Sequence, residues 1–115
     1  MPDEEVFYVQ SMEPWTMYFD GAARRSGASV GIIFISPERH MLPYSFTLSE
    51  LCSNNVAEYQ ALIIGLQIAL DMGITYIEIY GDSKLIINQL SHRYDVKHED
   101  LKSYFILAKR LMDKF

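Results

Sequence analysis

The chain has little of several features that mark specialised classes of protein. Its single cysteine, Cys52, allows no intrachain disulfide, and no Cys/His spacing typical of a zinc site occurs. The most apolar stretch, residues 61–70, is interrupted by Gly65 and Gln67 and is much shorter than the roughly 20 residues that a membrane-spanning helix needs. The first residues, MPDEE, are acidic where a signal peptide is basic. We therefore expect an intracellular protein, cytoplasmic or nuclear.

Positive charge is also scarce, and the formal net charge is −5. A protein that holds nucleic acid by its overall field needs a surplus of Lys and Arg, so any contact with nucleic acid must be local. Several scattered basic residues can supply such contacts, although each also fits an ordinary solvated surface charge. These residues are Arg24, Arg25, Lys84, His92, Arg93, Lys97, Lys109 and Arg110.

The order of apolar patterns predicts one α/β domain. Residues 1–14 are predicted to be a tail or linker, and residues 15–115 the domain. Three strand-like segments with short links, which favour an antiparallel meander, are followed by a helix, a strand and two helices. The predicted strands are 15–20, 28–36, 42–48 and 74–80, and the predicted helices are 53–72, 82–92 and 101–115. This order indicates a mixed sheet with helices packed on it.

Three acidic residues stand where such elements are expected to meet. Asp20 ends the first predicted strand, Glu58 opens a helix, and Asp82 follows the fourth strand. Each has an ordinary explanation: Asp20 before Gly21 suits a turn, and Asp82 suits a helix N-cap. Glu58 shares a helix face with Leu62, so it must pair with a cation, meet a metal or lie at the rim of the core. Together the acids suit Mg²⁺, which takes carboxylates and substrate phosphate oxygens, and they predict a metal-dependent phosphodiesterase.

Three segments carry a family resemblance: YFDGAARRSGASVGIIF, SNNVAEYQALIIGLQIAL and IEIYGDSKLIINQL. They resemble the ribonuclease H family, most of all the ribonuclease H domain of plant gypsy-type LTR retrotransposon polyproteins, which is associated with reverse transcriptase. The resemblance covers about residues 15–115. It implies a ribonuclease H-like mixed sheet of five strands flanked by helices.

The resemblance also implies an activity and a site. The activity is endonucleolytic hydrolysis of the RNA strand of RNA/DNA hybrids, with two Mg²⁺ or Mn²⁺ ions. The implied catalytic acids are Asp20, Glu58 and Asp82, and Gly21 joins them around the metals. Residues implied to contact the substrate are Gly21, Asn54, Asn55 and Ser83.

The family's fifth strand, last helix and fourth metal-binding acid lie beyond Phe115. The sequence is therefore expected to be either a truncated domain or a shortened relic, and Asp113 is not expected to replace the missing acid. A sheet edge and the apolar stripe on the last helix are expected to be less covered than in a complete domain, which favours self-association or marginal stability. The missing fourth acid is expected to leave hybrid cleavage weak or undetectable. The stripe is Leu101, Tyr104, Phe105, Ala108, Leu111 and Met112. The alternative function is an inactive ribonuclease H-like module that binds protein or hybrid.

Overall fold

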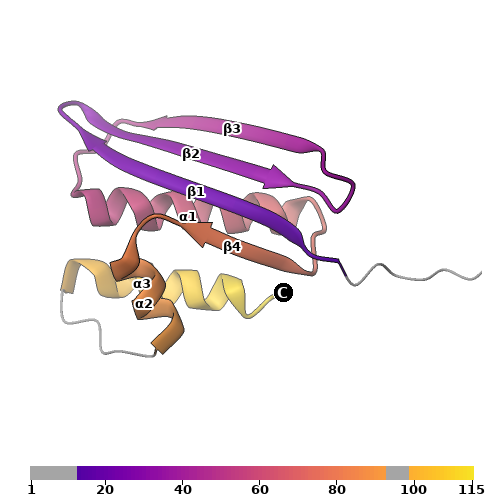
Figure 1. The fold of residues 1–115 in the computed structure, drawn as a ribbon. Coiled ribbons are helices and arrows are strands. Elements are labelled where there is room, and N and C mark those ends of the chain that lie inside the picture. The colour runs from indigo at the N-terminus through magenta and orange to yellow at the C-terminus, as the bar shows by residue number, and fades with distance from the viewer. Residues whose placement is uncertain (1–12, 93–98) are drawn as a thin grey trace, which may run out of the picture.

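The structure, a computed structural model, describes residues 13–92 and 99–115 and has an α/β fold (Figure 1). A meander of β1 (Trp15–Arg24), β2 (Gly27–Ile35) and β3 (Met41–Leu48) comes first. The elements that follow are α1 (Asn54–Asp71), β4 (Ile77–Gly81), α2 (Lys84–His92) and α3 (Glu99–Met112). The four strands form one sheet in the order β3-β2-β1-β4, in which β4 runs parallel to β1 and the other neighbours are antiparallel. The predicted mixed sheet with a meander is confirmed.

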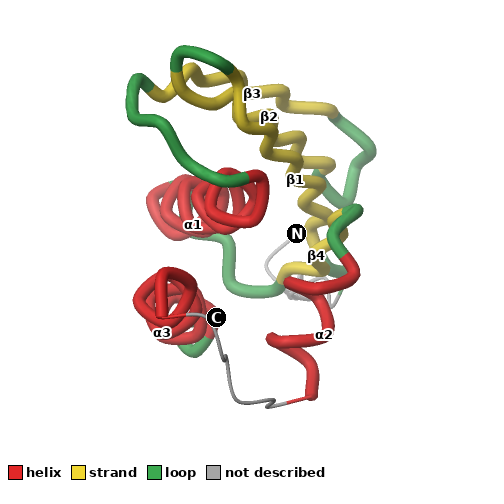
Figure 2. The backbone as a smooth tube through the Cα atoms, turned by 90° about the vertical axis from the view of Figure 1, so that its left-hand side faces the viewer, coloured by secondary structure: helices red, strands yellow, loops and turns green. Residues whose placement is uncertain are grey.

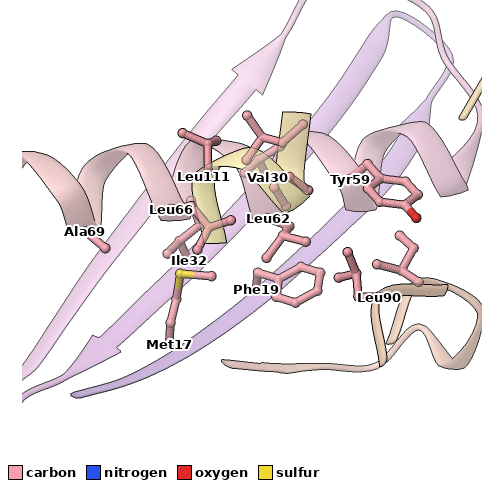
Figure 3. Close-up of a cluster of buried hydrophobic side chains, with 14 of the residues drawn as sticks. Met17, Phe19, Val30, Ile32, Tyr59, Leu62, Leu66, Ala69, Leu90 and Leu111 are labelled. Carbon is pink, nitrogen blue, oxygen red and sulfur yellow. The ribbon is translucent and has the colours of Figure 1, made fainter. Parts of the chain in front are cut away.

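The core lies between the sheet and α1. Alternate residues of β1 and β2, among them Met17, Phe19 and Ile32, are buried and point toward Leu62 and Leu66 of α1 (Figure 3). This alternation is what a strand produces when one of its faces is covered. Figure 2 shows α1 against one face of the sheet and α3 on the far side of α1.

The apolar stripe on the last helix is buried in part. Leu101, Ala108 and Leu111 are buried in the core cluster, and Tyr104 is partly buried against it. The stripe packs against α1, so the apolar face of α3 finds its cover within the chain. The larger side chains that α3 leaves exposed lie elsewhere on the helix, at Ile106 and Leu107.

The prediction that the first strand ends at Asp20 is also wrong. β1 continues through Arg24, which pairs with Gly27, so the hairpin turns at Arg25 and Ser26. Gly27 has a φ of +145°, a conformation that favours glycine and permits the tight turn. Asp20 therefore lies inside a strand rather than in a turn.

The other predicted element boundaries differ from the observed ones by fewer residues. β4 begins at Ile77 rather than at residue 74, because the backbone N–H of Ile74 donates to the Ala69 carbonyl at the end of α1. Most of the predicted tail falls outside the described residues. Within the described ranges, no helix is both long and apolar enough to cross a membrane.

Candidate functional site

The sheet face opposite α1 carries a broad groove. Along β1, Tyr18 and Asp20 are exposed on this face while Met17 and Phe19 are buried on the other. The groove has a volume of about 850 Å³ and reaches all four strands. Its lining combines aromatic and aliphatic residues with two acids, and includes Tyr18, Asp20, Gly31, Ile33, Pro43, Ser45, Tyr80 and Asp82.

Asp20 and Asp82 share this groove because β1 and β4 run in parallel. The last residues paired between the two strands are Phe19 and Gly81; Asp20 follows Phe19 within β1, and Asp82 is the first residue after β4. On the other side of β1, Asp20 pairs with Gly31, and a β-carbon built on Gly31 would meet no atom within 4 Å. Asp20 thus has open space on the β2 side and an acidic neighbour on the β4 side.

Asp82 is not the N-cap of α2. The Ser83 side chain fills that role, because its Oγ accepts a hydrogen bond from the Ile86 N–H at 3.3 Å. The structure therefore removes the ordinary explanation for Asp82. Within residues 13–92 and 99–115, no hydrogen bond or ion pair engages the Asp82 carboxylate, and the same is true of the carboxylates of Asp20 and Glu58.

Gly21 brings the first turn of α1 against β1. A β-carbon built on Gly21 would lie 2.7 Å from the Glu58 backbone nitrogen, so the two backbones meet there without room for a side chain. Glu58 is half-buried at the edge of the core, while Leu62 and Ala69 on the same helix face are fully buried. The three alternatives for Glu58 were a paired cation, a metal and a position at the rim of the core. The structure supports the position at the rim of the core.

The three acids do not form one metal-binding group as their side chains stand. Among the described residues, no three His, Cys, Asp or Glu side chains come close enough together to hold an ion. The expectation that all three carboxylates lie within reach of one shared ion is not met in this arrangement. The backbone nevertheless brings their three segments to one corner of the sheet, through the β1–β4 register and the Gly21 contact.

Asn54 and Asn55 begin α1, directly after the Ser53 N-cap. The Asn54 Oδ1 accepts a hydrogen bond from the Ala23 N–H at 2.8 Å, which attaches the start of α1 to the tip of the β1–β2 hairpin. Asn54 is exposed and Asn55 is half-buried. The structure therefore assigns Asn54 a tertiary contact that its sequence position alone did not reveal.

In the described part of the chain, some basic residues are exposed and one makes a hydrogen bond. Arg24 and Arg25 are exposed at the hairpin tip beside Asn54, and Lys84 is exposed just after Asp82. Lys109 is partly buried, and its Nζ donates to the Leu90 carbonyl at the end of α2, which is a structural role. Arg93 and Lys97 lie outside the described residues, as does the side chain of His92.

The sequence did not predict three tyrosine contacts near the acids. The rings of Tyr18 and Tyr80 stack on the open face with their centroids 5.3 Å apart. The Tyr80 hydroxyl donates to Glu78 at 3.0 Å, and this bond raises the pKa of Tyr80. On the core side, the Tyr59 hydroxyl donates to Gln89 Oε1, and burial raises the pKa of Tyr59 to about 12. Parallel pairing of β1 with β4 would have predicted the first contact.

Comparison with known proteins identifies relatives of this chain. The family model described as "Reverse transcriptase-like" matches residues 18–115. The protein named Ribonuclease HI from Halobacterium salinarum is 36% identical over 100 residues, which are 85% of this chain and 50% of that protein. The chain thus spans half the length of this relative.

Solved structures show the same fold. The crystal structure of RNase H1 from Halobacterium salinarum superposes with a TM-score of 0.82 at 35% identity, covering 90% of this chain and 80% of that one. The structure of LC11-RNase H1 in complex with RNA/DNA hybrid has a TM-score of 0.76 at 30% identity, covering 87% and 78% of the two chains. The similarity extends over nearly all of the described elements.

Proposed function

The chain belongs to the ribonuclease H family, and on this basis we propose that it hydrolyses the RNA strand of RNA/DNA hybrids with the help of divalent metal ions. The observation that carries the proposal is the pair of exposed aspartates, Asp20 and Asp82, in one groove beside the start of α1. LC11-RNase H1, a similar protein, was solved with an RNA/DNA hybrid.

The carboxylates of Asp20 and Asp82 are suitable ligands for Mg²⁺ or Mn²⁺. Both aspartates are exposed, and none of their carboxylate oxygens is used by a hydrogen bond or ion pair in the described part of the chain. Mg²⁺ usually binds one or two carboxylates and completes its shell with water and phosphate oxygens, so two aspartates are enough to begin a site. We assign Glu58 as the third carboxylate, which joins when its side chain turns from the core rim toward Asp20.

In a two-metal site the ions would activate the attacking water and stabilise the leaving 3′-oxygen. The protein's part is to hold the acids in place. The β1–β4 register sets Asp20 beside Asp82, and Gly21 lets the backbone of α1 approach from the other side. The open space over Gly31 leaves room for a phosphate next to Asp20.

We assign substrate contacts to the neighbouring hairpin tip and helix start. Because Asn54 Oδ1 is engaged by Ala23, its Nδ2 group remains to donate to a sugar hydroxyl, a contact that distinguishes RNA from DNA. Arg24 and Arg25 lie beside it and can meet phosphates despite the negative net charge. Asn55, Ser83 and the Gly21 backbone stay predicted contacts.

We also propose that the domain works within a larger reverse-transcriptase polypeptide of a retroelement. The description of the matching family model supports this setting, as does the sequence resemblance. Isolation of the full open reading frame, followed by a polymerase assay on the encoded protein, tests it.

The self-association expected from the sequence stays a proposal with a narrower basis. Since much of the α3 stripe is buried, the exposed sheet edges offer the surface for it. β4 and β3 are the two edge strands, and no other strand of the described residues pairs with their outer edges. Light scattering over a range of protein concentrations tests for dimers.

One observation favours the alternative of an inactive, hybrid-binding module: the three acids do not form a metal-holding group as their side chains stand. A cleavage assay separates the two functions. Labelled RNA/DNA hybrid, double-stranded RNA and double-stranded DNA are incubated with the protein and Mg²⁺, Mn²⁺ or chelator. The proposal predicts metal-dependent cleavage of the RNA strand of the hybrid alone.

The variants Asp20→Asn and Asp71→Asn complete this assay. Asp71 is also exposed, but it lies at the opposite end of α1, so its loss changes the net charge equally without touching the site. We expect Asp20→Asn to abolish cleavage and Asp71→Asn to retain it. Hybrid binding without cleavage in the unaltered protein would instead support the inactive module.

A further inference from the structure

A buried hydrogen bond connects the two helices that flank the acids. Tyr59 follows Glu58 on α1, and its side chain has no exposed area. Its hydroxyl donates to Oε1 of Gln89 on α2, which is 6% exposed. Figure 3 shows Tyr59 at the end of the core that Leu90 of α2 also enters.

This bond makes the position of α2 specific. The other buried side chains of α2, Ile86 and Leu90, make apolar contacts, which are not directional and tolerate small shifts. A buried amide is different, because leaving it without a partner is costly. Gln89 and Ser36 are the buried polar side chains in the described part of the chain, and only Gln89 lies on a helix. The bond to Tyr59 therefore favours one setting of α2 against α1.

The position of α2 determines the position of the Asp82 backbone. Ser83 is both the residue after Asp82 and the N-cap of α2, through its bond from the Ile86 N–H. A shift of α2 therefore moves the Asp82 backbone. On the other helix, Glu58 is adjacent to Tyr59, so the hydrogen bond joins the two segments that carry these acids.

We propose that Tyr59 and Gln89 are positioning residues that hold Asp82 at the correct separation from Glu58 for metal binding. This inference rests on the proposed function. Neither residue lies in the groove, and neither is assigned a contact with metal or substrate. Their effect is exerted through the relative placement of α1 and α2.

The test separates positioning from simple stabilisation by using three variants. Tyr59→Phe and Gln89→Met each leave one buried polar group unpaired, and both should lower the melting temperature. The double variant replaces both partners with apolar side chains of similar shape, so it should recover most of the stability. It still lacks the directional bond between the helices.

Each protein is measured by thermal melting, by calorimetric titration with Mg²⁺ alone, and by the Mg²⁺ concentration that gives half-maximal hybrid cleavage. Tyr104→Phe and Gln67→Met are matched controls, since they make the same changes on α3 and at an exposed position of α1. We expect the double variant to melt close to the unaltered protein and to bind Mg²⁺ about tenfold more weakly. The controls should match the unaltered protein in both respects.

Unchanged Mg²⁺ affinity in the double variant would overturn the inference while leaving the proposed function standing. A double variant that does not fold would also overturn it, because the pair would then be a requirement of folding. If the unaltered protein neither binds Mg²⁺ nor cleaves hybrid, the proposed function itself fails and the inference falls with it.

Discussion

Gly21 of β1 lies directly against the backbone of Ala57 in α1: a β-carbon built on Gly21 would be 2.2 Å from the Ala57 carbonyl oxygen. No real contact of that length exists, so any side chain at position 21 must push the start of α1 away from the sheet. The same turn of α1 carries Glu58, and the residue before Gly21 is Asp20. The closeness of the two backbones is therefore what brings two of the acids near each other.

Gly21→Ala should separate strand and helix. Because the obstructing atoms belong to the backbone and cannot rotate away, we expect a loss of about 1–3 kcal/mol in the free energy of unfolding and loss of hybrid cleavage. Urea denaturation and the cleavage assay measure the two effects. Gly31→Ala is the matched control for stability, since its added methyl group meets open space; equal destabilisation by both changes would contradict the explanation.

Asp82 and Ser83 should respond oppositely to mutation, although they are adjacent. Asp82→Asn leaves the helix cap in place and relieves the repulsion from Asp20, so the fold should be as stable or slightly more stable without metal, while cleavage is lost. Ser83→Ala removes the cap and should cost about 1 kcal/mol. Melting curves in chelator, recorded beside cleavage assays, distinguish the two. Strong destabilisation by Asp82→Asn with activity retained would show that Asp82 is structural.

The order of elements was predictable because strong local patterns specify it. Alternating aliphatic residues in β2 and the four-residue steps in α3 report which side is buried, and the glycine after α1 marks its end at Gly73, where φ is +77°. These signals depend on a few neighbouring residues. The lengths of the connections between the predicted elements then indicated a mixed sheet.

The errors came from residues whose role is set by distant partners. Gly21 was interpreted as a turn residue, but its absent side chain serves the approach of α1, which begins more than thirty positions later in the chain (Gly21 and Asn54). Asp82 suits an N-cap by its position in the sequence, but the three-dimensional path of the chain gives that role to Ser83. The bond between Tyr59 and Gln89 has no local signal, because a helical tyrosine fits an apolar core equally well.

Tyr59 should give the domain an alkaline sensitivity. The folded state holds the Tyr59 proton up to a pKa of about 12 because the side chain is buried, whereas an unfolded chain releases it near its ordinary value of 10.0. Between these values the folded state binds more protons, so its stability falls as pH rises. The full effect is about 2–3 kcal/mol.

Urea denaturation between pH 8 and 12 measures this effect. Tyr59→Phe is less stable at pH 8, where the hydrogen bond of the unaltered protein is intact, but it lacks the titrating group. Its deficit relative to the unaltered protein should therefore shrink as the pH approaches 12. Two curves that stay parallel across this range would show that Tyr59 does not keep its proton in the folded state.

Asn54 should separate a structural contact from a substrate contact. Asn54→Asp keeps an oxygen that accepts from the Ala23 N–H, and an acid is favourable in the first turn of a helix, so stability should be unchanged or slightly higher. It loses the amide donor and places a negative charge near the phosphates, so the KM for hybrid should rise. Asn54→Ala loses both functions and should also destabilise the fold by about 0.5–1.5 kcal/mol. Urea denaturation and steady-state kinetics on hybrid measure the two properties separately. An unchanged KM in Asn54→Asp would mean that Asn54 serves only to attach α1 to the hairpin.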